Sequence, residues 1–456
     1  MATLTSSLLN AANSMQVFTE SLNTIENNIT NANTPGYAAQ DQLLVAQPFD
    51  PSTGATGGVE AGPLISSRSD YLEQQVWNQS ESLGYAQQQS NDLNEVQPLF
   101  DLTSTTGIAS DLNNFFNSFS QLSISPNDTI SRQAVIQQAT ALAQNINGSA
   151  NTMNQTMDDI ASQTTDVVGN INQIASQIAA INQQYQSNAN NTQDAGLSAQ
   201  MYTALENLSS LANFTVLKQP DGTFTVLLGG QTPLVMGSQQ FQISANTSSQ
   251  TSILDSNGND ITSEITQGQL GALIQDRNTT IPGYLNTLNT FAQSLADTVN
   301  GQLNEGVDEN GNAPTTDLFS YDQPSDAAET IAVTGITPDQ IAAASSDAPG
   351  GNGNAIALAQ LATAPSVNGY SFTQYYGNLG TQVGNDVSSA QQNQTQFQDQ
   401  LTQAQAARAN QDGVSLNTEA AMVLQFQQAY QAAGQLVSIL NSMTQTVITM
   451  VSSTTA

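Results

Sequence analysis

The stretch LTSSLLNAANSMQVFTESLNTIENNITNANTPGY, residues 4–37, carries the strongest structural signal in this sequence. Its apolar residues alternate at spacings of four and three, which is typical of a helix that packs along one stripe in a coiled coil. Pro35 cannot continue a helix and Gly36 permits a turn, so the helix is predicted to end before Tyr37. The predicted stripe consists of Leu4, Leu8, Ala11, Met15, Phe18, Leu22, Ile25 and Ile29.

The C-terminal end of the chain repeats this pattern. Ser415 can cap a helix, and Glu419 lies in its first turn, where the helix dipole favours an anion. The spacing predicts a stripe of Leu416, Glu419, Val423, Phe426, Tyr430, Ala433, Val437, Leu440, Thr444, Val447 and Val451. A second row widens it and consists of Met422, Ala429, Leu436, Met443 and Met450.

Neither terminal helix is expected to be stable alone. Both stripes are interrupted by Asn, Ser and Thr, which cost up to ~0.7 kcal/mol each relative to Ala in a helix. Burial of the apolar stripe must offset this cost, and the other end of the same chain is the first candidate partner. On periodicity alone, a bundle closed by its two termini and a module for assembly with other chains fit equally well.

Composition excludes several classes of function. The chain has 456 residues with 5 Lys or Arg, 37 Asp or Glu, no His and no Cys, and a net charge of −32. Without His or Cys there is no Ser-His triad, thiol nucleophile, disulfide or ordinary zinc site. So few cations cannot neutralise a row of phosphates, so no nucleic-acid binding is expected. No apolar run is long enough for a membrane span, and no Sec-type signal peptide is expected.

The interior alternates between helical and β patterns. Helix is predicted for most of 71–202, 265–303 and 370–411, where Asp128 is expected to form an ion pair with Arg132. Residues 37–70 and 306–353 are rich in Gly, Pro and Asn and are expected to be irregular.

Alternating apolar and polar residues around the turn at 220–222 predict a β hairpin. We therefore expect a mainly α protein with three domains. Terminal coiled-coil helices (1–35 and 412–456) form the first, an elongated helical bundle (36–212 and 263–411) the second, and a small β-rich outer domain (213–262) is inserted mid-chain.

Candidate chemistry is sparse. The segments 255–260 and 308–312 are similar to calcium loops, but Asp260 and Ala313 occupy the sixth position, where an EF-hand requires Gly. Both are interpreted as Asn-Gly turns. No catalytic, cofactor-binding or metal-ligating residue is predicted. Paired carboxylates can hydrolyse glycosides without His or Cys, but no pair stands out among the acidic residues.

Four segments carry a resemblance to a known family. NNITNANTPGY (27–37) and SLNTEAAMVLQFQQAYQAAGQLVSIL (415–440) resemble the terminal signatures of flagellar rod, hook and hook-associated proteins. Segments 112–142 and 267–306 resemble more narrowly the family of hook-associated protein 1, the first hook–filament junction protein. The residues of the first signature are Asn31, Asn33, Thr34, Pro35, Gly36 and Tyr37.

The resemblance implies a structural subunit, without catalysis, that joins the flagellar hook to the filament by self-assembly through its terminal helices. It implies secretion by the flagellar type III route to the hook–filament junction. The implied partners are copies of itself in a tube, the hook protein, the second junction protein, a cytosolic export chaperone on the C-terminal helix, and the export apparatus. The alternatives are another axial protein (hook, distal rod or second junction protein) or a carboxylate-only cell-wall glycosidase.

Overall fold

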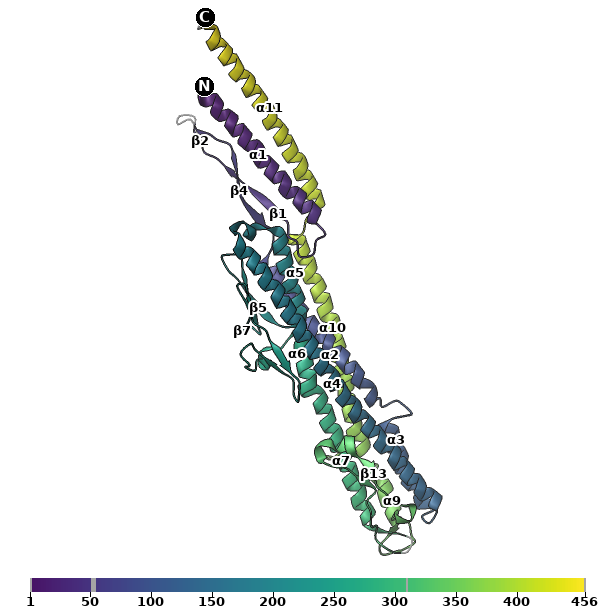
Figure 1. Ribbon diagram of the computed structural model, residues 1–456. Helices are drawn as coiled ribbons and strands as arrows, with labels where there is room; N and C mark the ends of the chain where they lie inside the picture. The colour runs from purple at the N-terminus through teal and green to yellow at the C-terminus, as the bar shows by residue number, and fades with distance from the viewer. Residues whose placement is uncertain (1, 51–54, 309–310, 455–456) are drawn as a thin grey trace.

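The computed structural model describes residues 2–50, 55–308 and 311–454. The molecule is elongated, with both ends of the chain at the same end (Figure 1). Two long helices form that end, a bundle of helices forms the body, and a small sheet lies on the flank of the body. The mainly helical prediction, with paired terminal helices and a small inserted sheet, is confirmed.

The terminal end consists of helix α1 (Ala2–Asn31) and helix α11 (Leu416–Thr454), which pack against each other in antiparallel orientation. The ring centroids of Phe18 and Phe426 lie 6.1 Å apart at this contact. In Figure 1, α11 continues beyond the start of α1.

A β hairpin lies beside α1, formed by strands β1 (Gln40–Ala46) and β4 (Val59–Ser66). Strands β2 (Phe49–Asp50) and β3 (Ala55–Thr56) extend it. The prediction of irregular chain over 37–70 was therefore wrong. Among the described residues, Pro48, Gly57 and Gly58 lie between consecutive strands, and Gly62 and Pro63 lie within β4, where the pairing with β1 shifts its register.

The body is built on α4 (Thr129–Ser187), a helix of 59 residues. Asp128 caps its start by accepting a hydrogen bond from the Ser131 N–H at 2.9 Å. The predicted ion pair between Asp128 and Arg132 does not form, because Arg132 donates instead to the carbonyl oxygens of Pro126 and Pro338. The other body helices are α2 (Asp70–Val96), η1 (Gln97–Phe100), α3 (Ile108–Ile124), η2 (Ala189–Gln193), α5 (Ala195–Leu211), α6 (Gly268–Gln275), the π-turn η4 (Asp276–Thr280), α7 (Ile281–Asn304) and α10 (Phe372–Asp412).

The inserted sheet has four antiparallel strands in the order β5 (Phe214–Lys218), β6 (Phe224–Leu228), β7 (Thr232–Met236) and β8 (Gln239–Gln240). Phe224, Val226 and Leu228 point into the core, as their alternation predicts. Asn182 of α4 anchors the sheet through its side-chain amide, which donates to the Phe224 carbonyl and accepts from the Phe224 N–H, both at 2.8 Å. Three short elements complete the insert, namely β9 (Ser244–Asn246), β10 (Ser252–Leu254) and η3 (Thr262–Glu264).

The end of the body farthest from the termini contains α3, part of α7 and the segment 305–353 (Figure 1). The sequence of 306–353 predicts irregular chain, but the described residues of this segment form short paired strands. Its core is aromatic, because the rings of Phe115 and Phe319 lie 5.6 Å apart and those of Phe291 and Phe372 lie 6.0 Å apart. The short elements are β11 (Gly306–Val307), β12 (Phe319–Ser320), η5 (Pro324–Asp326), α8 (Ala327–Thr330), β13 (Ala332–Val333), η6 (Pro338–Gln340), β14 (Ala344–Ser345) and α9 (Gly353–Gln360).

Within the described residues, no helix is both long enough and apolar enough to cross a lipid bilayer.

Candidate functional site

The stripe residues of the two terminal helices differ widely in burial. Ala11, Ile25 and Leu440 are buried. Ile29, Leu416, Tyr430 and Val451 are exposed. The remaining positions are half-buried and comprise Leu4, Leu8, Met15, Phe18, Leu22, Val423, Phe426, Ala433, Val437 and Val447.

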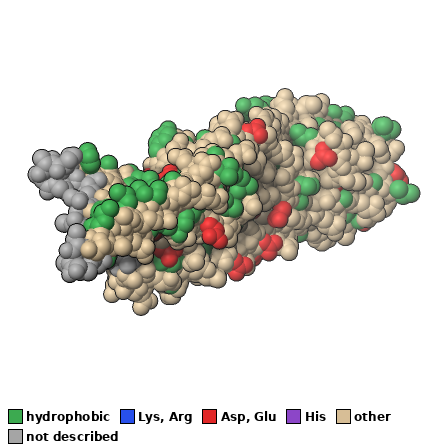
Figure 2. All heavy atoms as spheres, turned by 90° about the horizontal axis from the view of Figure 1, so that it is seen from above, with side chains coloured by type: hydrophobic (Ala, Val, Ile, Leu, Met, Phe, Trp, Pro, Cys, Tyr) green, Lys and Arg blue, Asp and Glu red, His purple; other side chains and the backbone are tan. Residues whose placement is uncertain are grey.

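The antiparallel pair therefore covers one side of each helix and leaves much apolar surface open. Half or more of the side-chain surface of Leu424, Ile439 and Met443 is exposed. Figure 2 shows hydrophobic side chains gathered at the end of the molecule that carries the termini, and no Lys or Arg side chain is visible on that face. We call the exposed apolar side chains on the two sides of α1 the apolar outer face. On α11 they are Leu416, Leu424, Tyr430, Leu436, Ile439, Met443, Ile448, Met450 and Val451, and on the hairpin, which lies across α1 from α11, they are Leu43, Leu44, Val45, Phe49 and Ile65.

The segment 31–37 turns the chain from α1 into the hairpin. Asn31 donates to the Asn27 carbonyl at 3.0 Å and accepts from the Thr34 hydroxyl at 3.1 Å, so these side chains close the end of the helix. The Pro35 carbonyl accepts a hydrogen bond from the Thr203 hydroxyl of α5 at 3.3 Å. Asn33 is exposed.

Gly36 is required where it stands. Its φ is +70°, a conformation that L side chains rarely adopt. A Cβ there would lie 2.5 Å from the Ala199 carbonyl oxygen of α5 and 2.4 Å from the Thr203 hydroxyl. The turn therefore lies directly against the body, beside a groove of about 660 Å³ lined by Pro35, Tyr37, Ile181 and Thr203 among others.

Asn28 of α1 connects three segments by hydrogen bonds. Its amide donates to the Gln40 carbonyl at 2.9 Å and to the Glu419 carboxylate at 3.0 Å. Its amide oxygen accepts from the Tyr37 hydroxyl at 2.9 Å and from the Gln40 N–H at 3.0 Å. Asn28 therefore holds α1, the start of the hairpin and the first turn of α11 together.

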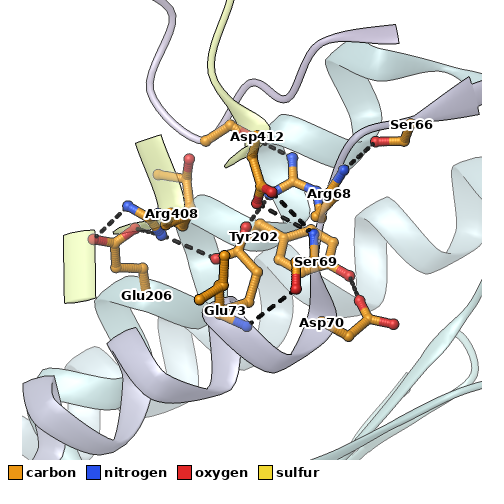
Figure 3. A network of polar contacts seen from close by, with 12 residues as sticks. Ser66, Arg68, Ser69, Asp70, Glu73, Tyr202, Glu206, Arg408 and Asp412 are labelled. Carbon is orange, nitrogen blue, oxygen red and sulfur yellow. Dashed lines mark hydrogen bonds and ion pairs between the residues drawn. The ribbon is translucent and has the colours of Figure 1, made fainter. Parts of the chain in front are cut away.

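A buried ion-pair network follows where the terminal end meets the body (Figure 3). Glu73 of α2, whose side chain is 1% exposed, pairs with Arg68 and, at 2.9 Å, with Arg408 of α10. Arg408 also pairs with Glu206 of α5 at 2.9 Å. Arg68 donates to the Gly36 carbonyl, and its guanidinium lies 3.9 Å from the centre of the Tyr202 ring.

Asp412, the last residue of α10, ties both connections between body and termini together. Its carbonyl accepts from the Ala39 N–H at 2.8 Å and from the Ser67 hydroxyl at 3.0 Å. Its carboxylate accepts from the Ser69 N–H at 3.1 Å, as Figure 3 shows. We call the contacts of Asn28, Gly36, Arg68, Glu73, Arg408 and Asp412 the joint.

Burial changes the pKa values of several ionisable groups at the joint. Burial raises the pKa of the Tyr37 hydroxyl to about 12, and the Glu419 charge adds to the increase. Burial also raises the pKa values of the Asp412 and Glu419 carboxyl groups, while hydrogen bonds from the Ser69 N–H and from Asn28 oppose the two increases. Burial acts to lower the pKa of Arg408, but its hydrogen bond and charge interaction with Glu206 raise it overall.

The contacts of the joint are structural, since they connect the terminal helices to the body. Glu73 is neutralised by two arginines, the Asp412 carboxylate accepts from the Ser69 N–H, and Glu419 accepts from the Asn28 amide. Among the described residues, no group of three or more His, Cys, Asp or Glu side chains could hold a metal ion.

No local pattern of residues in the sequence predicts the joint. Two of the five basic residues, Arg68 and Arg408, meet at one buried glutamate. The small number of basic residues is the only feature of the sequence that points to Arg68 and Arg408, because each basic residue is then expected to have a specific partner. Their partners are distant in sequence, so no local spacing connects them.

Comparisons with known proteins agree with this architecture. A family model described as the helical domain of flagellar hook-associated protein FlgK matches residues 93–319. Flagellar hook-associated protein 1 of Bacillus subtilis is 25% identical over 94% of this chain and 94% of its own length. The Escherichia coli protein of the same name is 27% identical over 70% of this chain and 61% of its own length.

A solved structure shares the fold. The flagellar hook junction protein FlgK from Burkholderia pseudomallei matches with a TM-score of 0.66 and 18% identity, covering 76% of this chain and 100% of that one. The family model, the full-length relative and the shared fold agree with one another. The chain belongs to the family of flagellar hook-associated protein 1, the structural and non-enzymatic protein of the flagellar hook–filament junction.

Proposed function

We propose that this chain acts by self-assembly, in which the apolar outer face packs against copies of the same chain around a tube. The observation that carries this proposal is the open side of α11, where Leu436 is 48% exposed and Met443 is 50% exposed. Groups of exposed apolar side chains are typical of surfaces that become buried in an interface. Head-to-tail contacts of this kind need not close on themselves, as a tubular lattice requires.

The α1–α11 contact and the apolar outer face have separate roles in this proposal. The contact between α1 and α11 forms within one subunit, and the joint holds the pair in a defined direction relative to the body. The apolar outer face then meets the neighbouring subunits. The hairpin adds exposed apolar side chains on the other side of α1, where Phe49 is 73% exposed.

The same surface accounts for the further partners that we propose. The hook protein and the second junction protein would contact it at the two ends of the junction. An export chaperone would cover the C-terminal helix before secretion through the flagellar export apparatus. Met443 and Met450 are both at least half exposed, and Met side chains adapt to more than one partner.

The test separates the two roles by substitution. Leu436→Asp changes an exposed position on α11, so the purified monomer should keep its helix content in circular dichroism. The same variant should lose filament attachment in a complemented deletion strain, because an aspartate would be buried without a partner in the lattice. Ser438→Asp is the matched control, since Ser438 is an exposed polar residue of the same helix.

Two results would refute this proposal. One is normal attachment of filaments by the Leu436→Asp variant. The other is equal loss of attachment by Leu436→Asp and Ser438→Asp, because any charge on α11 would then be harmful whether or not it replaced an apolar contact.

A further inference from the structure

Two carboxyl groups face each other inside the helical body, away from the joint. Asp92 of α2 is 2% exposed, and Asp276, the first residue of the π-turn, is fully buried. The π-turn has a local cause. Pro282 has no N–H to continue the ladder of hydrogen bonds, and the Ile281 N–H bonds to the Asp276 carbonyl five residues back.

The pair is short of hydrogen-bond donors. The Gln88 amide donates to one oxygen of Asp92 at 2.7 Å. The other Asp92 oxygen and both Asp276 oxygens are buried and have no well-formed hydrogen bond, although the Thr280 hydroxyl and the Gln89 amide interact with Asp276 and oppose the rise in its pKa. The charge of Asp276 and a hydrogen bond between the two carboxyl groups both act to raise the pKa of Asp92. A single proton between them would supply the missing donor.

No basic side chain neutralises the pair. Arg277 is adjacent in sequence, but its guanidinium donates to the carbonyls of Met157 at 3.0 Å, Ser249 at 2.6 Å and Thr247 at 2.8 Å. The other cations are occupied elsewhere, with Arg68 and Arg408 at the joint, Arg132 at the Pro338 carbonyl and Lys218 over the Phe224 ring. Two unpaired buried carboxylates would each strongly destabilise the fold.

The remaining titratable neighbours add negative charge or are neutral. From α2, Glu95 raises the pKa of Asp92 further, and Tyr85 faces Asp276. From α7, Tyr284 faces Asp276, while its hydroxyl donates to Asp386 of α10 at 2.7 Å.

Helices α4 and α6 contribute uncharged groups near the pair. Gln163 of α4 and Gln269 of α6 both hydrogen-bond to Gln88. The acidic residues of α4 in this region, Asp158, Asp159 and Asp166, are exposed.

We propose that Asp92 and Asp276 form a proton-binding site, in which one shared proton holds α2 against the π-turn between α6 and α7. While the proton is bound, the pair carries a single delocalised charge and a hydrogen bond joins the two elements. When the proton leaves, two buried anions face each other and the contact between α2 and the π-turn opens. This device is independent of the apolar outer face and of the joint.

The direction of the pH dependence follows from burial. Burial raises the pKa values of both groups, and the charge of Asp276 raises that of Asp92 further. A folded-state pKa above the unfolded value stabilises the protein at low pH, and this stabilisation is lost as the pH rises through the folded-state value. The helical body is therefore expected to be most stable in acid and to lose stability as the pH rises.

The experiment compares the full-length chain with the Asp92→Asn/Asp276→Asn variant, which keeps the side-chain volumes and cannot titrate. Urea unfolding between about pH 6 and about pH 9.5 gives the unfolding constant at each pH. Below the folded-state pKa of the pair, the constant of the parent chain should rise about tenfold per pH unit relative to that of the variant, and this rise should end above that pKa. Asp166→Asn, at an exposed position of α4, is the matched control and should follow the parent.

A second measurement does not depend on how stable the double variant is. Hydrogen exchange of the parent chain should accelerate with pH in peptides covering 88–96 and 270–284 beyond the intrinsic increase, and not in peptides from 112–122. Parallel pH profiles for parent and double variant would overturn the proposal. Stabilisation at high pH by added calcium or sodium ions at constant ionic strength would also overturn it, because a cation would then hold the pair.

Discussion

Glu73 is the residue on which the joint depends most, and Glu73→Gln measures that dependence. The substitution keeps the volume of the side chain but removes the charge shared by Arg68 and Arg408. The Arg68 side chain is only 7% exposed and has Glu73 as its single carboxylate partner among the described residues. Arg408 is 20% exposed and retains Glu206.

The expected magnitude follows from these exposures. Breaking a buried ion pair from one side leaves an uncompensated charge and costs about 3–5 kcal/mol. Glu206→Gln removes a carboxylate that is 28% exposed, next to an arginine that keeps Glu73. Ion pairs open to solvent contribute about 0.2–1 kcal/mol, so this second substitution should cost less than about 1 kcal/mol.

Trp77 provides the assay. It is the only tryptophan of the chain, and its ring lies 5.9 Å from that of Tyr202, which carries Arg68 on its ring face. Urea unfolding followed by tryptophan fluorescence therefore reports on the joint. The two variants should differ in unfolding free energy by at least about 2 kcal/mol. Equal effects of Glu73→Gln and Glu206→Gln would refute the argument that burial, rather than the number of ion pairs, determines the contribution.

Three further outcomes are expected. Gly36→Ala should destabilise the joint by at least about 1–2 kcal/mol, because φ is positive and the Cβ meets the body; a thermal melt unchanged from the parent would contradict this. Leu22→Asp should lose about 2–3 kcal/mol of pairing between the terminal helices, and Val437→Asp should do the same. Both variants should lower helicity and stop filament attachment while Trp77 fluorescence stays native, and normal swimming would count against them. Burial raises the pKa of Glu81 to about 7, while a hydrogen bond from the Phe214 N–H acts to lower it. Its stabilising contribution is therefore present below the unfolded-state pKa and is lost as the pH rises through about 7. Glu81→Gln should remove this loss of unfolding free energy from urea titrations at increasing pH, and an unchanged pH profile would show that Glu81 does not cause it.

Local sequence was sufficient to predict most of the helices. The stripe from Leu4 to Ile25 and the alternation of Phe224, Val226 and Leu228 are short-range patterns, and a helix or strand repeats its own geometry every few residues. For the same reason, the end of α1 near Asn31 was predictable from Pro35 and Gly36. The hairpin at 40–66 was missed because Gly and Pro suggest irregular chain, whereas Gly62 and Pro63 lie within the paired strand β4 at a shift in register.

Local residue spacing does not predict contacts between residues that are far apart in the sequence. Arg132 was predicted to pair with Asp128, four residues away. In the structure it donates instead to the carbonyl of Pro338, which is 206 residues away in the sequence. Asp128 instead caps its own helix. A spacing of four residues makes an ion pair possible, but a buried guanidinium goes where several carbonyl oxygens converge.

The amino-acid sequence by itself determined that this chain is a mainly helical, cation-poor protein without the groups for His- or Cys-based catalysis, whose two ends need burial to be helical. Those properties depend on residue types and on spacings within a few turns. Only the tertiary structure decided that Glu73 would form ion pairs with two arginines, that Asn28 would connect three segments, and that Asp92 would lie near Asp276. Each of those contacts brings together residues from different elements, and their energies depend on burial, which arises only when the elements pack.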